Sequence, residues 1–525
     1  MPTTSLTASL TTPPTTSLTT SLTIADVLEQ HVRSFPDGTA VACGDATHTY
    51  PELADRSRRL AGWLAAEGVG RGDRVLWLGQ NCHRVLECVL ACAHLGAMVC
   101  PANWRQSADE TAFVVDDLAP RVVVWQEQEI GPVVRQARDR ARHRATWVRH
   151  DDDGAGSYEA LLAGAPPPPP PSAAADDPVV VLYTAAFDGT PNGALLTQAN
   201  LLAQSVMIAM LQGIGADTVY LNCGPLFHIA TLFVMFPTFH FGGTNVFLAR
   251  PDPEEICRLV DRHRCTSCFI LPPTIAEVVA ANAAGRYDLS SLRTAFDMPE
   301  WRAMTSPDPS PWGARPAGYG QSEVVGLATF AALGGRAGDF TTGRASPLVQ
   351  VRLVDDADRE VAAGDVGEIV VRGWTVGAGY WNRPALNERR SRGGWWHTND
   401  LGRRNPDGTV TFVGPKVRVI KSASENVYPV EVEQCLAAHP AVQDVAVIGV
   451  PDPRWGQSVK AVVVRRPDRP VTADELIDHC RDRIAGYKRP RSVEFATDLP
   501  RSAAGKDYDE LDRQYGGGGY PGSAP

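Results

Sequence analysis

The segment 179–193 carries residue types that point most directly to chemistry. An apolar run from Val179 to Leu182 leads into a turn-rich loop that ends at Gly193, and a helix is predicted from about Gln198. Glycines and hydroxyls in a loop of this kind let backbone N–H and side-chain O–H groups approach the oxygens of an anion.

The eleven cysteines are the other residues that could carry chemistry. Their number is odd, and the one closely spaced pair, Cys265 and Cys268, lacks a second pair at zinc spacing. We expect reduced thiols, as in the cytoplasm, rather than a metal site or disulfides. No basic residue precedes Arg33, so neither a signal peptide nor a transit peptide is predicted, and a cytoplasmic location is expected.

Composition limits the classes of partner. The 525 residues are 44% hydrophobic and 21% charged, which predicts a globular chain with several buried cores. The net charge of −10, without a dense basic stripe, argues against a nucleic-acid partner. The uncharged stretch 226–249 is interrupted by Pro237 and Gly242, so it is expected to form buried core elements and no membrane span.

Strand-like and helix-like segments alternate along most of the chain. Strands are predicted at 74–78, 98–101, 244–248 and 267–271, and helices at 84–94, 253–262 and 275–284. This alternation is typical of an α/β fold with mainly parallel, helix-covered sheets. Beyond residue 414, helices at 430–438 and 473–484 and strands at 442–450 and 458–465 predict a compact α+β unit.

These patterns divide the chain into five parts. We predict a disordered Ser/Thr-rich tail at 1–23, a large domain at 24–414, a hinge at 415–418, a small domain at 419–512 and a flexible tail at 513–525.

Motifs in a fixed order resemble the adenylate-forming (ANL) superfamily of acyl-CoA synthetases, peptide-synthetase adenylation domains and beetle luciferases. The matching segments are 183–193, Pro225–His228, Gly318–Glu323, Trp396–Asp400, Ile420–Pro429, Pro451–Gly456, Ala485–Pro490 and Leu499–Lys506. The segments at 451–456 and 485–490 resemble CoA ligases more than peptide synthetases. The resemblance covers roughly 24–512 and implies a multi-subdomain N-terminal domain with a small, mobile C-terminal domain.

The resemblance implies two half-reactions in one cleft. A carboxylate and ATP give an acyl-adenylate and pyrophosphate, and then the CoA thiol attacks the acyl carbon and expels AMP. The small domain rotates between the two halves.

The resemblance also assigns roles to residues. Tyr319 would stack on adenine, Asp400 would accept the ribose hydroxyls, and Glu323 would hold Mg²⁺. The remaining adenylate-binding residues would be Thr184, Gly189, Gly320, Gln321 and Ser322.

Three residues would act on the reacting groups. Lys506 would contact the carboxylate and the α-phosphate, Lys421 would lie near the adenylate phosphate and favour AMP departure, and His228 would lie between the acyl pocket and the thiol channel. Val417 would be the hinge pivot, and Ser422, Ala423, Ser424, Glu425 and Asn426 would frame the pantetheine tunnel of CoA.

The phosphate loop departs from the family pattern. Ala185, Ala186 and Phe187 replace hydroxyl and glycine positions, Asp188 adds a negative charge, and Asn192 replaces a lysine. A carboxylate about 4 Å from a phosphate charge is unfavourable by roughly 4 kcal/mol at an effective dielectric near 20, unless Mg²⁺ bridges the two. We therefore expect weak binding of the ATP triphosphate.

Two further departures lie at the domain junction. Gly414-Pro415 lacks the family's arginine, and Ala423-Ser424 replaces a Gly-Gly pair where pantetheine would pass.

These observations leave three hypotheses. The preferred one is an acyl-CoA ligase that forms a thioester from CoA and a preformed acyl-adenylate, which a companion adenylating ligase supplies. In this division of the reaction the chain resembles the split acyl-CoA ligase systems of actinobacterial diterpenoid biosynthesis. The alternative is an ordinary two-step ligase that also needs ATP and Mg²⁺; the third is a pseudoenzyme that binds acyl-adenylate or CoA. The acyl group is expected to be an apolar carboxylic acid bound along Phe227–Phe241, and a homodimer is a further expectation.

Overall fold

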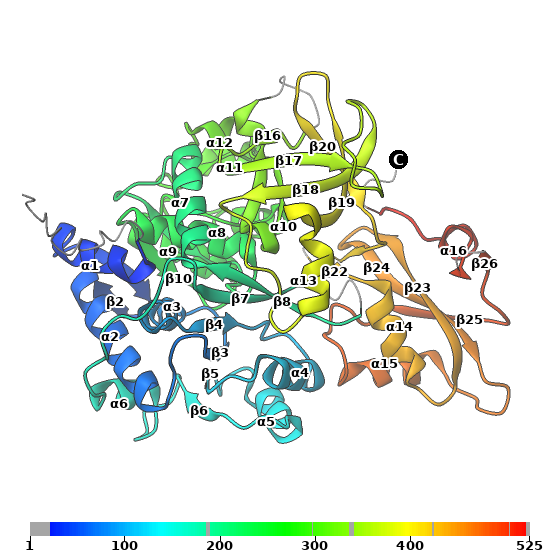
Figure 1. Ribbon diagram of the computed structural model, residues 1–525, viewed down its shortest axis with the longest axis horizontal. Coiled ribbons are helices and arrows are strands. Elements are labelled where there is room, and N and C mark those ends of the chain that lie inside the picture. The colour runs from blue at the N-terminus through cyan, green and yellow to red at the C-terminus, as the bar shows by residue number, and fades with distance from the viewer. Residues whose placement is uncertain are drawn as a thin grey trace, which may run out of the picture.

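The computed structural model describes residues 22–184, 189–296, 298–334, 341–422, 425–502 and 505–520 (Figure 1). The predicted N-terminal tail lies outside the described residues except for its last two positions. Thr23 is the N-cap of α1 (Ile24–Ser34), where its hydroxyl accepts the Asp26 N–H, so α1 begins with a capping box.

A six-stranded sheet forms the first half of the large domain. Its order is β6 (Thr146–Arg149), β5 (Val122–Trp125), β3 (Arg74–Leu78), β4 (Met98–Pro101), β7 (Pro178–Thr184) and β8 (Asn192–Thr197). All neighbours are parallel up to β7, and β8 is antiparallel. The phosphate-loop segment therefore connects β7 to β8 at the edge of this sheet.

A second sheet packs against the first through α3. Its order is β11 (Ser267–Cys268), β9 (Val219–Asn222), β10 (Thr244–Phe247), β1 (Thr39–Cys43) and β2 (Ala46–Thr49). Helix α3 (His83–Leu95) contacts strands of both sheets and buries nearly every side chain. A helix buried on nearly all sides fits this position between two sheets; of its residues only Arg84 and His94 are partly exposed.

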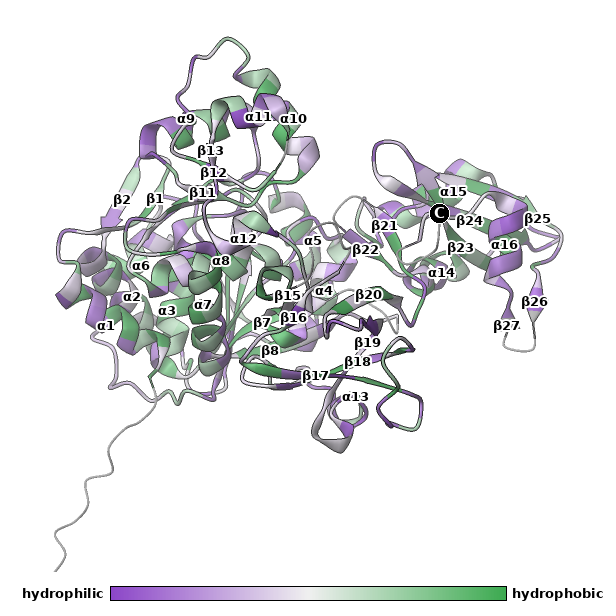
Figure 2. Cartoon of the chain, turned by 90° about the horizontal axis from the view of Figure 1, so that it is seen from above, coloured by the Kyte–Doolittle hydropathy of each residue, from purple (hydrophilic) through white to green (hydrophobic). Residues whose placement is uncertain are grey.

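The remaining helices of the large domain cover these sheets. They are α2 (Tyr50–Ala66), α4 (Ala108–Leu118), α5 (Gly131–Arg140), α6 (Tyr158–Ala163), α7 (Gln198–Gln212), α8 (Ile229–His240), α9 (Pro253–His263), α10 (Pro272–Ala281), α11 (Pro299–Met304), α12 (Pro311–Ala314) and α13 (Pro384–Arg390). Figure 2 shows α7 and α8 as largely apolar helices. Among the described residues no helix is long and apolar enough to cross a membrane.

Two antiparallel sheets complete the large domain and carry the motif residues Tyr319, Gly320, Gln321 and Asp400. The first contains β14 (Gly318–Gln321), β15 (Gly326–Phe330) and β16 (Arg344–Ala345). The second contains β17 (Val349–Val354), β18 (Val366–Gly373), β19 (Trp396–Arg404) and β20 (Val410–Pro415). A short pair, β12 (Arg293–Thr294) and β13 (Ser306–Pro307), lies near the second parallel sheet.

The small domain, orange to red in Figure 1, is a sheet covered on both faces. Its strands are β21 (Ile420–Ser422), β22 (Glu425–Val427), β23 (Val442–Asp452), β24 (Gly456–Arg465) and β25 (Ser492–Ala496). Along β23, Val445 and Val447 pack with the core of α14 (Pro429–Ala437) and α15 (Ala473–Arg481), while Ala446 and Ile448 face α16 (Tyr508–Tyr515). The period of two is the ordinary strand alternation.

Several predicted elements have other bounds in the structure: the predicted helix 275–284 is α10 (Pro272–Ala281), and the predicted helix 473–484 ends at Arg481. The predicted strand 267–271 ends at Cys268, because the next residues leave the sheet and Phe269 lines a pocket. The predicted tail from 513 onward instead continues α16 to Tyr515 and packs back on the sheet, where the Tyr520 hydroxyl accepts the Gly449 N–H at 2.8 Å. The contacts of Tyr520 with Gly449, Asp512 and Arg418 hold this segment against the sheet despite its many glycines.

A buried lysine connects the small domain to the large domain. Lys488 is 4% exposed, and its Nζ donates to Glu110 of α4 at 2.7 Å and to Glu431 of α14. Arg105 of the large domain also pairs with Glu425 of the small domain. These ion pairs hold the two domains in the arrangement seen here.

We predict that Lys488→Met loosens this docking. Removing the cation leaves two buried carboxylates face to face, which destabilises the docked arrangement by roughly 3–5 kcal/mol. Hydrogen exchange measured by mass spectrometry should then become faster in α4 and α14. The control is Lys460→Met, which breaks an ion pair with Glu494 inside the small domain and should leave exchange in α4 unchanged. If hydrogen exchange in α4 also stays unchanged in Lys488→Met, the prediction is wrong.

Candidate active site

A cleft of about 500 Å³ lies where the two domains meet. Many of the residues that the motifs singled out line it: Thr184, His228, Gly320, Gln321, Ser322, Glu323, Tyr319, Asp400, Val417, Lys421, Glu425 and Asn426. The β7–β8 edge, the β14–β15 sheet, β19 and the small-domain strands β21 and β22 supply them. Segments far apart in the sequence therefore converge on one cavity.

The structure places other predicted residues away from the cleft wall. Ser422 is buried in β21, and Gly189 faces α14, where an added Cβ would lie 2.3 Å from Gln434 Nε2. Lys506, on β27 (Gly505–Lys506), donates to Glu433 Oε2 at 2.8 Å and to the Val445 carbonyl, so its ammonium faces the small domain itself. Ala185–Asp188, Ala423 and Ser424 lie outside the described residues.

Tyr319 and Asp400 form one hydrogen-bonded unit. The Tyr319 hydroxyl donates to Asp400 Oδ2 at 2.8 Å, and its ring stacks on Phe412 of β20 with centroids 5.6 Å apart. One face of the Tyr319 ring is thus covered by protein. Burial raises the pKa of Asp400 to about 6. Within the described chain Asp400 Oδ1 has no hydrogen bond, so it could accept from a ribose hydroxyl.

Glu323 is buried beside Tyr380. The Tyr380 hydroxyl donates to Glu323 Oε1 at 2.6 Å, and burial raises the pKa of this carboxyl. Among the described residues Glu323 belongs to no cluster of three potential metal ligands. Mg²⁺ is commonly held by one or two carboxylates plus substrate phosphates, so Glu323 fits a magnesium site only together with a nucleotide.

Asn192, which stands where the family has a lysine, does not reach the cleft. It is fully buried at the start of β8, with Nδ2 donating to the Thr190 carbonyl at 3.1 Å. Its Oδ1 accepts from Arg383 Nε at 3.1 Å, and Arg383 Nη1 pairs with Asp117 Oδ1 at 2.8 Å. The guanidinium charge next to this position is therefore balanced by a carboxylate.

His228 caps α8 and stands between two cavities. Its Nδ1 accepts the Ala230 N–H at 3.2 Å, so the ring proton is assigned to Nε2. The side chain is exposed to the cavities, and the surrounding walls desolvate the imidazole and lower its pKa. The ring is neutral at pH 7 and offers a donor to the cavity. Lys421 is reached by solvent in the cleft, whose walls partly desolvate its amine and lower its pKa.

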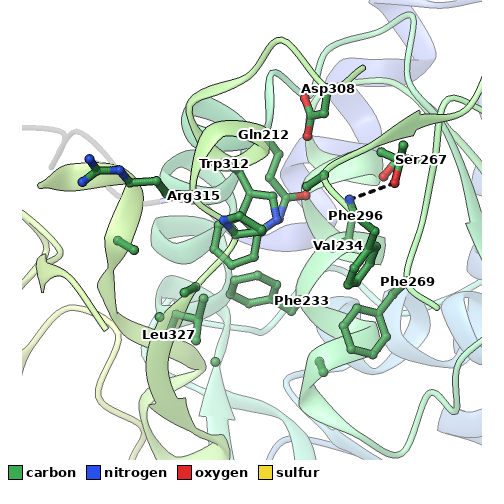
Figure 3. Close-up of a pocket in the computed structure, with 18 of the residues that line it drawn as sticks. Gln212, Phe233, Val234, Ser267, Phe269, Phe296, Asp308, Trp312, Arg315 and Leu327 are labelled. Carbon is green, nitrogen blue, oxygen red and sulfur yellow. Dashed lines mark hydrogen bonds between the residues drawn. The ribbon is translucent and has the colours of Figure 1, made fainter. Parts of the chain in front are cut away.

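A second cavity of about 880 Å³ opens beside the cleft and shares His228 and Gln321 with it. Figure 3 shows its walls, which include Phe233, Val234, Phe269, Phe296, Trp312 and Leu327. Of the segment Phe227–Phe241, which is expected to line the acyl pocket, only part faces this cavity. Phe233 does line it, but Phe236 and Phe239 on other faces of α8 pack into the protein core.

Several residues of the site carry no sequence signal. Arg383 reaches Asn192, and Asp117 reaches Arg383, only through tertiary structure. Trp312 and Phe269 come from segments without a recognisable motif. Lys488 lies within a recognised motif, but its role in docking depends on its partners Glu110 and Glu431.

Comparison with known proteins agrees with this geometry. The family model of AMP-binding enzymes matches residues 28–381, and that of the AMP-binding enzyme C-terminal domain matches 431–506. A feruloyl-CoA synthase from Amycolatopsis is 36% identical over 502 residues, with 93% of this chain and 98% of the relative covered.

A second relative and a solved structure point the same way. A 7a-methyl-1,5-dioxo-octahydro-1H-inden-4-yl propanoyl:CoA ligase from Mycobacterium tuberculosis is 32% identical, with 91% of this chain and 96% of the relative covered. The structure of an o-succinylbenzoate CoA synthetase double mutant from Bacillus subtilis, bound to a product analogue, has a TM-score of 0.77 at 26% identity and covers 93% of this chain and 98% of that one. The chain therefore belongs to the AMP-binding enzyme family, in its acyl-CoA ligase branch, and is an acid–thiol ligase.

Proposed function

We propose that this acyl-CoA ligase makes an acyl-CoA thioester from an acyl-adenylate and CoA, and that it forms the adenylate from ATP weakly or not at all. The observation that carries the proposal is the fully buried Asn192, whose amide is engaged by Arg383 and the Thr190 carbonyl. Where the family has a lysine that binds phosphate, this chain has Asn192, which brings no positive charge to the cleft.

The charge balance supports the same conclusion. Phosphates bind where donors and cations offset their charge. Arg383 cannot take over from the missing lysine while it pairs with Asp117. An acyl-adenylate has a single phosphate and depends more on Tyr319, Asp400 and the acyl pocket, which are all present.

We infer that the arrangement of domains seen here serves thioester formation. Glu425 and Asn426 line the cleft, whereas Lys506, expected to assist adenylation, is held by Glu433. Asn426 Oδ1 is buried without a hydrogen-bond partner among the described groups, so it could accept from an amide N–H of pantetheine.

The chemical step then follows from the positions of two side chains. The CoA sulfur attacks the acyl carbon, the bond from that carbon to the phosphate oxygen breaks, AMP leaves, and the thiol proton passes to solvent. Lys421 lies in the cleft with Asp400 and would stabilise the charge on the departing phosphate. His228 donates from Nε2 toward the reacting carbonyl while its Nδ1 remains bound to the Ala230 N–H.

The second candidate is an ordinary two-step ligase, and Lys506 favours it. A rotation at 415–418 would carry Lys506 toward the cleft, and Glu323 is present to bind Mg²⁺, which would offset phosphate charge during adenylation. Retention of both residues also disfavours the third candidate, a binding protein without activity.

The three candidates make different predictions for one assay. We expect purified enzyme with CoA and synthetic feruloyl-adenylate or lithocholoyl-adenylate to give thioester at least about 100-fold faster than the same acid with ATP and Mg²⁺, because loss of transition-state charge stabilisation costs about this factor. Product is followed by liquid chromatography. Comparable rates support the two-step ligase, and adenylate binding without product supports the third candidate.

Lys506→Ala separates the two half-reactions. We expect it to abolish any ATP-driven product and to leave the rate from synthetic adenylate within about twofold, because Lys506 lies outside the cleft in this arrangement. Lys421→Ala should slow the adenylate reaction by about 10-fold or more. Equal losses of both activities in Lys506→Ala would show that the role of this side chain is misassigned.

The pKa of Asp400 predicts a pH dependence of nucleoside binding. Ribose hydroxyls donate to the ionised carboxylate, and a group with a pKa of about 6 is mostly protonated at pH 5 and mostly ionised at pH 7. Adenosine, which has no titrating phosphate, should therefore bind about tenfold more tightly at pH 7 than at pH 5 by calorimetry. Asp400→Asn should remove the difference; a pH-independent wild-type affinity would contradict the assignment.

A further inference from the structure

The acyl cavity is larger than a single-ring acid requires. Its volume of about 880 Å³ is near the upper end of the range of roughly 300–1,000 Å³ that is usual for small-molecule sites. Ligands of this class are mostly enclosed by their pocket, so a small acid would leave much of this cavity without contacts. The volume favours a bulky acyl group.

The walls are apolar and largely aromatic. Phe233 and Leu327 lie on one side and Phe269 and Phe296 on another, with Trp301 also contributing (Figure 3). Aromatic side chains have few rotatable bonds and offer large flat surfaces. Walls of this kind pack well against rigid rings.

Polar side chains interrupt this apolar surface at several points, among them Thr266, Ser267, Asp308 and Gln321. Gln212, the last residue of α7, and Trp312 of α12 both line the cavity, and Figure 3 shows them close together. The two helices contact each other. Neither residue lines the cleft, whereas His228 and Gln321 at the junction line both cavities. Gln212 and Trp312 are thus part of the acyl cavity alone.

The polar atoms of these two residues are unused. Among the residues that the structure describes, neither the Gln212 amide nor the Trp312 indole N–H makes a hydrogen bond to protein. The buried Gln321 Nε2, at the junction with the cleft, also lacks one, whereas Thr294 and Thr266 are engaged. Thr294 accepts the Phe296 N–H and the Trp301 indole N–H, and Thr266 accepts the Val219 N–H. Unused donors in a largely apolar pocket fix the orientation of a ligand that carries a matching acceptor.

We propose that the acyl group is a rigid, multi-ring carboxylic acid with a hydroxyl or ketone oxygen remote from its carboxylate, and that Gln212 and Trp312 determine specificity by donating to that oxygen. The inference rests on the proposed function, since it concerns the acid whose adenylate the enzyme consumes. A relative named for a ring system with two oxo groups shares 32% of its sequence with this chain, which is consistent with this class of acid. A flexible fatty acid would leave both donors without a partner.

The test uses four synthetic adenylates, so that it does not depend on ATP. Lithocholoyl-adenylate carries a ring hydroxyl, cholanoyl-adenylate has the same skeleton without it, and palmitoyl- and feruloyl-adenylate represent a flexible chain and a single ring. We expect kcat/KM for thioester formation to be highest for lithocholoyl-adenylate, about tenfold above cholanoyl-adenylate.

Two variants then test the donors. In Gln212→Leu and Trp312→Phe, the ratio of lithocholoyl to cholanoyl kcat/KM should fall from about tenfold to near one, because a site built to bind an oxygen loses its preference with the donor. Met210→Leu, an exposed position on the same helix, is the matched control and should keep the ratio. Circular dichroism verifies that each variant is folded.

The outcomes separate this inference from the proposed function. A preference for palmitoyl- or feruloyl-adenylate, or an equal drop for both steroid adenylates in the two variants, overturns the inference while the ligase activity stands. If no adenylate gives thioester, the proposed function fails. Calorimetry with the non-reactive sulfamoyl analogues of the lithocholoyl and cholanoyl adenylates still tests the pocket: tighter binding of the lithocholoyl analogue supports the inference, and equal binding overturns it.

Discussion

Compensation of phosphate charge is the constraint on which this site depends. A triphosphate brings several negative charges into a cleft, and each must meet a donor, a cation or water. Asn192 is buried and bound to Arg383, and Arg383 is neutralised by Asp117, so neither offers charge to a nucleotide in the cleft. We therefore infer that the site is better matched to an acyl-adenylate, with its single phosphate charge, than to ATP.

The arrangement of the two domains determines which charged residues of the small domain face the cleft. Two groups of ion pairs hold the small domain with β22 at the cleft. They are Lys488 with Glu110 and Glu431, and Arg105 with Glu425. The same arrangement leaves Lys506 bound to Glu433. In this arrangement the residues that we propose to face CoA line the cleft, and the lysine expected to assist adenylation lies outside it.

Local patterns predicted much of the fold. The strands 74–78 and 98–101 match β3 and β4 residue for residue, because short apolar runs in a parallel sheet are buried on both sides and end sharply at turns. The α/β class, the small α+β domain and the family were also predicted correctly. The resemblance assigns Tyr319 to the adenine and Asp400 to the ribose of one nucleotide, which implies that the two side chains lie close together. In the structure they form a hydrogen bond.

The remaining features of the site depend on contacts between residues that are distant in the sequence, which the spacing of motif residues does not reveal. The direction of Lys506 follows from how the domains dock, and the burial of Asn192 follows from Arg383, which is distant in the sequence. The acyl cavity takes one face of α8 but draws other walls from the segment after β11 and from α12. Sequence reasoning therefore placed the pocket near α8 and missed most of its aromatic lining.

Exchange of labelled pyrophosphate into ATP, measured with enzyme, acid and Mg²⁺ in the absence of CoA, tests the central claim most directly because it reports adenylate formation alone. The account predicts no exchange above background from an enzyme preparation that converts synthetic acyl-adenylate to thioester. Rapid, acid-dependent exchange would contradict it and would show that the triphosphate is held and activated despite the buried Asn192.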